Sequence, residues 1–77
     1  MKFYRLTLTI APVASFEHTK FDFDFAGFDC KDAKKQAEEI IEDMKEYHIE
    51  KAVLVWFSKD YYHRYTWKYD FESGRWI

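Results

Sequence analysis

Apolar and polar residues alternate along three stretches of this 77-residue chain, at positions 2–10, 18–27 and 61–71. Successive side chains of a strand point to opposite faces, so a period of two predicts strands that each bury one face. The buried side of these strands is expected to carry Tyr4, Leu6, Leu8, Ile10, Phe21, Phe23, Phe25 and the odd-numbered residues from Tyr61 to Phe71.

Between the second and third of these stretches, the apolar spacing becomes that of a helix. Asp29 is expected to cap its start, because a carboxylate accepts hydrogen bonds from the exposed N–H groups of a first turn. The buried stripe is expected to contain Ala33, Ala37, Ile40, Ile41 and Met44, and to continue to Tyr47 or His48. Two alanines at the start of the stripe predict that the helix lies close to the sheet.

Residues 52–57 are apolar on both faces, which is typical of an inner strand. Residues 72–74 predict a hairpin turn, and residues 75–77 a short fifth strand. The expected fold is α+β: one amphipathic helix packed on a four- to five-stranded antiparallel sheet, in the order ββαββ(β), as a single domain over residues 1–77.

Two orders of the strands in the sheet fit this pattern. The order 2-1-3-4-5 is antiparallel throughout and gives the third strand the inner position that its composition favours. The alternative is a β-grasp of order 2-1-4-3, with a parallel centre. In either order the second strand is expected at an edge, where Asp22 and Asp24 discourage pairing with another molecule.

The residue types that carry catalysis are present without the spacing that catalysis needs. His18, Cys30, His48 and His63 are too scattered to match the ligand spacing of a zinc site. Only two glycines are present, so a phosphate-binding loop is not expected. We therefore expect a protein that is not an enzyme, with no catalytic residue, no metal and no cofactor.

The single cysteine and the short apolar runs indicate where in the cell this protein is expected. Cys30 has no internal disulfide partner, which suits a reducing cytoplasm. No apolar run approaches the length of a membrane-spanning helix. We expect a cytoplasmic protein with no membrane contact.

The charges of the predicted helix are reversed relative to its dipole. Lysines occupy its first turns, and from residue 38 to residue 50 six acidic residues against one lysine leave a net charge of −5. Each end charge placed this way costs about 0.3–1 kcal/mol at low salt. Departures from local rules can mark functional surfaces. We expect a protein partner with a basic surface to bind Glu38, Glu39, Glu42, Asp43 and Glu46.

Two other functions remain open. Tyr62, Arg64 and Lys68 on the sheet face away from the helix combine a ring with cations, as surfaces that bind nucleic acid do, although a net charge of −2 gives no general attraction to nucleic acid. One helix covers only one face of a sheet, and 22% of the residues are aromatic. A structural homo-oligomeric module, for example a homodimer through the open face, would bury the remaining apolar side chains.

In its small size, acidity and ββαββ layout, the chain resembles small phage-encoded inhibitors of bacterial defence systems, among them anti-CRISPR proteins. The resemblance covers the whole chain but involves no shared motif, so no functional residue carries over from it. It implies a viral protein in the host-cell cytoplasm. Such a protein would inhibit a nuclease complex by occupying the basic groove that binds nucleic acid.

Overall fold

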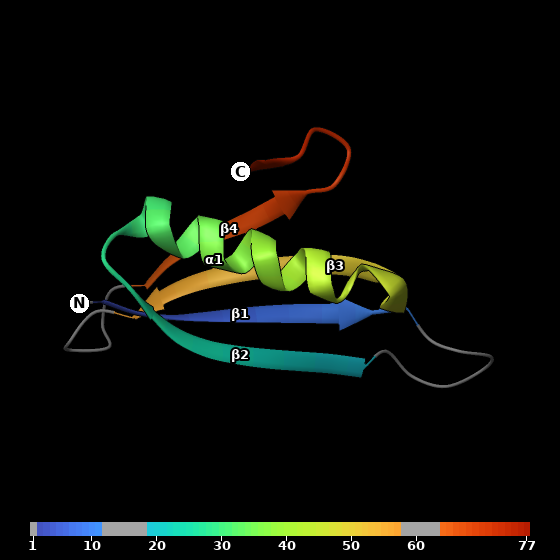
Figure 1. Ribbon diagram of the computed structural model, residues 1–77, viewed down its shortest axis with the longest axis horizontal. Coiled ribbons are helices and arrows are strands. Elements are labelled where there is room, and N and C mark those ends of the chain that lie inside the picture. The colour runs from blue at the N-terminus through green and yellow to red at the C-terminus, as the bar shows by residue number, and fades with distance from the viewer. Residues whose placement is uncertain (1, 12–18, 58–63) are drawn as a thin grey trace.

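The computed structural model describes residues 2–11, 19–57 and 64–77, with Arg64 described by its backbone alone. These residues include five strands and one α-helix (Figure 1). The elements in chain order are β1 (Lys2–Ile10), β2 (Thr19–Gly27), α1 (Cys30–Asp43), the 3-10 turn η1 (Lys45–Tyr47), β3 (Ile49–Phe57), β4 (Arg64–Asp70) and β5 (Arg75–Trp76). The residues of the predicted strands that lie outside the described part are His18, Tyr61, Tyr62 and His63.

The strands form one sheet of order β2-β1-β3-β4-β5, and all neighbouring strands are antiparallel. This confirms the α+β fold and the 2-1-3-4-5 order. The β-grasp alternative is wrong, because β3 and not β4 pairs with β1. β3 is the middle strand and β2 is an edge, as the apolar run and the paired aspartates predicted.

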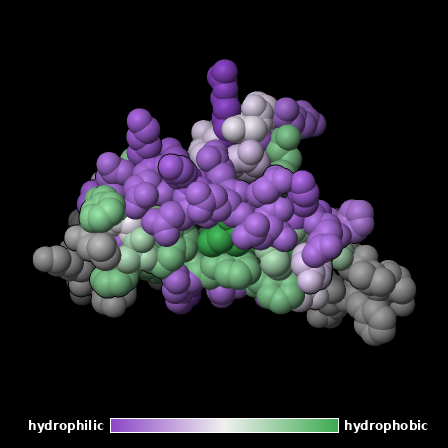
Figure 2. All heavy atoms as spheres, in the orientation of Figure 1, coloured by the Kyte–Doolittle hydropathy of each residue, from purple (hydrophilic) through white to green (hydrophobic). Residues whose placement is uncertain are grey.

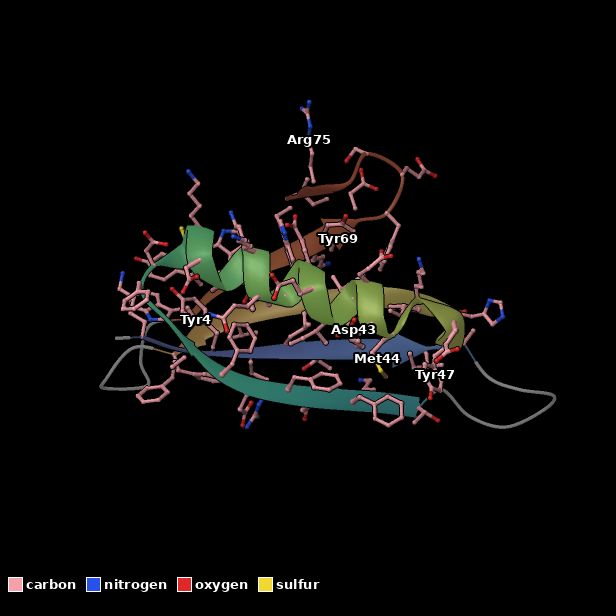
Figure 3. All side chains as sticks on the ribbon, in the orientation of Figure 1. Tyr4, Asp43, Met44, Tyr47, Tyr69 and Arg75 are labelled. Atoms are coloured by element: carbon pink, nitrogen blue, oxygen red, sulfur yellow. The ribbon has the colours of Figure 1, made fainter. Side chains whose placement is uncertain are left out.

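The core lies between α1 and the sheet face that α1 covers. Leu6 pairs with Phe23 on one neighbouring strand and with Leu54 on the other, so a row of apolar residues crosses three strands beneath the helix. Tyr4 lies under the first turns of α1 (Figure 3). Burial raises the pKa of the Tyr4 hydroxyl above its usual value. The buried core residues are Tyr4, Leu6, Leu8, Ile10, Ala33, Ala37, Ile41, Ala52 and Leu54.

Two side-chain caps hold the start of α1. The Asp29 carboxylate accepts a hydrogen bond from the backbone N–H of Asp32 at 2.8 Å, and the Asp32 carboxylate accepts one from the N–H of Phe28 at 3.0 Å. The Gln36 amide donates to the carbonyl of Ala26 at 3.0 Å, which ties the helix to the end of β2. The predicted N-cap is therefore confirmed.

Removal of this cap should have a measurable cost. We expect Asp29→Ala to lower the free energy of unfolding by about 1 kcal/mol, because the N–H of Asp32 loses its acceptor. Asp29→Asn keeps an acceptor oxygen and should lose clearly less. Urea unfolding of both variants at one pH measures the difference, and equal losses would contradict the capping role.

The apolar stripe of α1 ends earlier than predicted. Met44 caps the C-terminal end, and Tyr47, in η1, is exposed. His48 follows with a φ of 55°, a left-handed conformation that turns the chain toward β3. The prediction that Tyr47 or His48 extends the stripe is wrong, because the α-helix ends before these residues and its spacing no longer applies to them. The Ala11 N–H donates to the His48 carbonyl at 3.0 Å and so fastens the corner to the end of β1.

α1 covers the rings of β4 only in part: Trp67 and Tyr69 pack against the core as expected, whereas Tyr65 does not. In the view of Figure 1, α1 passes in front of β3, and its Lys34 ammonium lies 5.1 Å from the ring centroid of Trp67 in β4. Tyr65 faces the helix side and is nevertheless 55% exposed, while Trp67 and Tyr69 are half-buried. Phe21, on the opposite edge strand, is also exposed. A helix is about 10 Å wide, and four strands about 4.8 Å apart extend beyond it on both sides.

β4 and β5 are joined by the predicted turn. The Asp70 carboxylate accepts hydrogen bonds from the Ser73 hydroxyl at 2.8 Å and from the Glu72 N–H at 3.2 Å. Gly74 has a φ of 70°, which glycine adopts without steric cost. Two backbone hydrogen bonds, of 2.9 and 2.8 Å, join Lys68 to Ile77 and confirm the short fifth strand.

Candidate functional site

The acidic residues predicted to bind a partner lie on the exposed part of α1 and η1, with Glu38 on the flank of α1 nearer to β4 and β5. All of them are exposed, while the buried residues Ala37 and Ile41 between them face the core. Hydrophilic side chains run along α1, and a more apolar band of the sheet lies below them (Figure 2). We use the name acidic surface for Glu38, Glu39, Glu42, Asp43 and Glu46.

Two carboxylates of the acidic surface have side-chain partners. Glu42 accepts a hydrogen bond from the Lys45 ammonium at 2.6 Å, which raises the pKa of that lysine. Glu38 accepts one from the Trp76 indole N–H at 3.3 Å. The remaining acidic residues make no hydrogen bond or ion pair with any residue in the described part of the chain; they are Glu39, Asp43 and Glu46.

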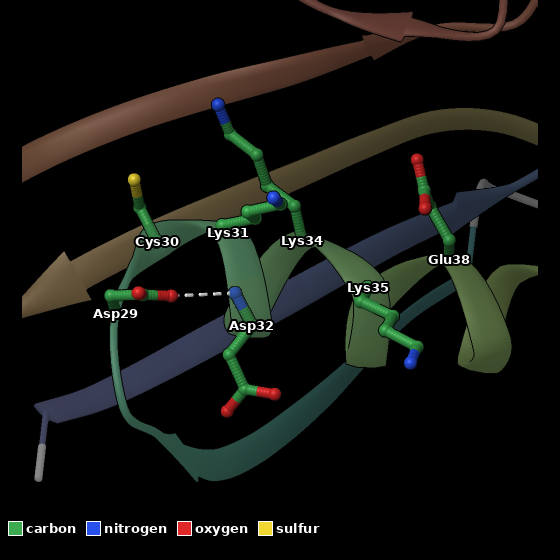
Figure 4. Close-up of a pocket in the computed structure, with 7 residues that line it drawn as sticks. All are labelled: Asp29, Cys30, Lys31, Asp32, Lys34, Lys35 and Glu38. Carbon is green, nitrogen blue, oxygen red and sulfur yellow. Dashed lines mark hydrogen bonds between the residues drawn. The ribbon is translucent and has the colours of Figure 1, made fainter.

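The first turns of α1 border a shallow hollow of about 580 Å³ (Figure 4). Cys30, Lys34 and Glu38 extend from the side of α1 nearer to β4, whereas Asp32 and Lys35 extend from the other side. The lining groups therefore do not converge on a single ligand atom. Within residues 2–11, 19–57 and 64–77, no group of three or more His, Cys, Asp or Glu side chains could hold a metal ion.

Aromatic rings gather on the helix side of β3 and β4, where α1 covers them only in part. The ring of Tyr65 lies nearly parallel to those of Trp56 and Trp67, at centroid distances of 4.9 and 6.4 Å. The ammonium of Lys2 lies 5.2 Å from the Trp56 ring centroid, and that of Lys34 lies 5.1 Å from the Trp67 centroid, both within cation–π range. We call Trp56, Tyr65 and Trp67 the aromatic strip. The alternation along residues 61–71 predicts that Tyr65 and Trp67 lie in the core. Trp67 packs against the core, whereas Tyr65 is exposed, because one helix is narrower than four strands.

The sheet face turned away from α1, which we call the open face, has no helix or strand of the described chain lying on it (Figure 1). Arg5 donates two hydrogen bonds to the Asp24 carboxylate, at 2.7 and 3.0 Å, which hold the pKa of Asp24 below its usual value. The Thr7 hydroxyl donates to Asp22 at 2.7 Å. Alternation along the paired strands also places on this face Phe3, Val53, Val55, Phe57, Thr66 and Lys68.

The open face is also where a nucleic-acid site was predicted. Lys68 is exposed on it. Arg64 is described by its backbone alone, and Tyr62 lies outside the described residues. The structure therefore places one of the three predicted side chains, and this set stays a prediction.

Comparison with protein-family models, with curated proteins and with solved structures finds no match to this chain. None of the described helical segments is both long enough and apolar enough to cross a membrane.

Proposed function

We propose that this chain is a small interaction protein that binds a basic surface of a partner protein through its acidic surface. The observation that supports this function is a set of three exposed carboxylates that make no hydrogen bond or ion pair with any described residue, namely Glu39, Asp43 and Glu46. Residues four positions apart lie about 5–6 Å from one another on a helix, so Glu39 and Asp43 are neighbours on α1, and Glu46 follows them in η1.

The position of these charges on the helix adds to the argument. They follow the middle of α1, toward the negative end of its dipole, and the last turn has no basic residue. Such acidic residues are unfavourable by about 0.3–1 kcal/mol each. A cationic partner would offset this repulsion, so binding gains from a charge compensation that the free protein lacks.

The resemblance to phage-encoded inhibitors of defence systems gives this binding a purpose. A nuclease complex holds nucleic acid in a groove lined with lysine and arginine. The acidic surface would occupy such a groove and so exclude nucleic acid. The partner class is thus a basic protein that handles nucleic acid, and inhibition follows from competition for its groove.

Charge reversal tests this function. Glu39→Lys and Glu72→Lys change the net charge equally, but only Glu39 belongs to the acidic surface. Immobilised wild type and Glu72→Lys should retain the same basic protein from a bacterial lysate. Glu39→Lys should retain about tenfold less of it, and Glu39→Lys with Asp43→Lys should retain none, because like charges then face each other.

Salt and competition provide further measurements. Exposed charge pairs are screened over about 8 Å at physiological ionic strength and over about 3 Å at 1 M. Retention should therefore fall steeply between these conditions, and the retained protein should release a bound oligonucleotide when the chain is added. Equal retention by the double reversal, with its circular dichroism unchanged, would show that the acidic surface is not the interface.

A second candidate function depends on the aromatic strip. Tyr65 is more than half exposed, and ammonium groups of Lys2 and Lys34 flank the strip. Rings beside cations bind single-stranded nucleic acid by stacking and charge. Filter binding of single-stranded oligonucleotides at low salt separates the two functions: tight binding that Tyr65→Ala abolishes favours the strip, and no binding by the wild type leaves the interaction function.

A further inference from the structure

One row of residues across the open face carries opposite charges at its two ends. Asp22 pairs with Thr7, Thr7 with Val53, and Val53 with Lys68, so these four residues cross β2, β1, β3 and β4 in line. Asp22 and Lys68 are both exposed. When a second copy of such a row is rotated by 180° and placed against the first, each carboxylate lies opposite an ammonium.

The strand register defines which two-fold axis brings these opposite charges of two copies together. A two-fold axis parallel to the strands and midway between β1 and β3 places β2 of one copy opposite β4 of the other. Asp22 then faces Lys68 of the second copy, and Lys68 faces Asp22 of the second copy. Because Phe3 pairs directly with Phe57 across β1 and β3, the same axis places each Phe3 against Phe57 of the other copy.

We propose that two copies of this chain associate face to face through their open faces. Phe3 is 67% exposed, and Val53 and Val55 are half-buried, so apolar surface remains to be covered. Among the polar groups, Arg5 and Asp24 already satisfy each other and enter the interface as a hydrogen-bonded pair. This mixture of apolar and paired polar groups is typical of subunits that also exist apart.

The dimensions of the face set the expected strength. Four strands about 4.8 Å apart, taken over about seven residues each, give a flat area of about 450 Å² per copy. This area lies at the low end of specific interfaces, so we expect a dimer that dissociates at micromolar concentration. Aligned sheets cross at about 30°, which displaces the edge strands by a few ångströms. A lysine side chain spans that displacement.

The dimer would have four layers, with a helix on each outer side of two stacked sheets. Each copy would then present its acidic surface outward, away from the other. The association depends only on the open face, and it stands or falls independently of the proposed function. If both hold, the dimer binds basic partners at two opposite sides and gains avidity from an extended or repeated partner.

Sedimentation equilibrium of the full chain between 1 and 500 μM tests the association. We expect a reversible monomer–dimer equilibrium in the wild type. Asp22→Lys and Lys68→Asp should each weaken it about tenfold, because like charges then meet across the two-fold axis. The double variant with both changes restores opposite charges and should recover most of the association.

The matched controls are Glu39→Lys and Lys35→Asp, which make the same charge changes on the exposed side of α1. They should leave the equilibrium unchanged, and circular dichroism checks the fold of every variant. A wild type that stays monomeric at 500 μM would overturn the proposal. So would single reversals that match the controls, or a double variant no better than the single ones.

Discussion

Leu54→Ala should lower the free energy of unfolding by about 2–5 kcal/mol, the range for deletion of a large buried aliphatic side chain. Leu54 is fully buried in the middle strand and pairs with Leu6 and Trp67 on its two neighbours. The sheet cannot collapse around the missing atoms, because β1 and β4 hold β3 by hydrogen bonds on both sides. A domain of this size is stable by about 4–12 kcal/mol in total. The variant should therefore lose a large fraction of the total stability.

Ile77→Ala is the matched control for this change, because it removes the same number of carbon atoms from a side chain that is 74% exposed. Its effect should stay within about 0.5 kcal/mol. Urea unfolding of both variants measures the difference. The slope of the free energy of unfolding against urea concentration should be the same in both, which checks the two-state assumption. Comparable losses at the two positions would contradict a core centred beneath α1.

The strands and their order could be predicted because each carries its own evidence. The period of two between Tyr4 and Ile10 identifies the buried face of β1, and apolar residues on both faces identify β3 as the middle strand. Asp29 identifies the start of α1, because the cap is a local interaction that three residues complete. Features with such local causes were predicted correctly.

The end of α1 and the exposure of β4 have non-local causes. His48 adopts a left-handed conformation where the chain turns back to β3, and the spacing of apolar residues does not predict this turn. Tyr65 and Trp67 have the alternation of core residues, but their burial depends on where the helix lies across the sheet. That position depends on packing between α1 and the sheet, where Ala33 and Ala37 are fully buried, and periodicity alone does not describe this packing.

The candidate surfaces also differ in whether local or non-local features of the chain determine them. Exposure of the acidic surface could be predicted, since Glu39 and Asp43 fall outside the buried stripe of the helix at helical spacing. The opposition of Asp22 and Lys68 on the open face required the register of three strand pairs, in which a shift of one residue moves a side chain to the other face. The aromatic strip required the lateral position of the helix.

Ala37→Leu tests that position and should destabilise the protein by about 1–3 kcal/mol, although it adds apolar surface. Ala37 is fully buried between α1 and the sheet, so a larger side chain must push the two apart. Ala33 is equally buried, and its Cβ lies 3.4 Å from the position that a Cβ on Gly27 would occupy, so the start of α1 is already close to β2.

Lys35→Leu places the same leucine on the exposed side of the same helix and should change stability much less. Urea unfolding measures both variants, and a change in tryptophan fluorescence of Ala37→Leu should accompany its loss of stability, since Trp67 lies beneath Lys34 of α1. A displaced helix would move Lys34 away from that ring. If Ala37→Leu were as stable as the wild type with unchanged fluorescence, the small size of Ala37 would not be what holds the helix close to the sheet, and the exposure of Tyr65 would need another cause.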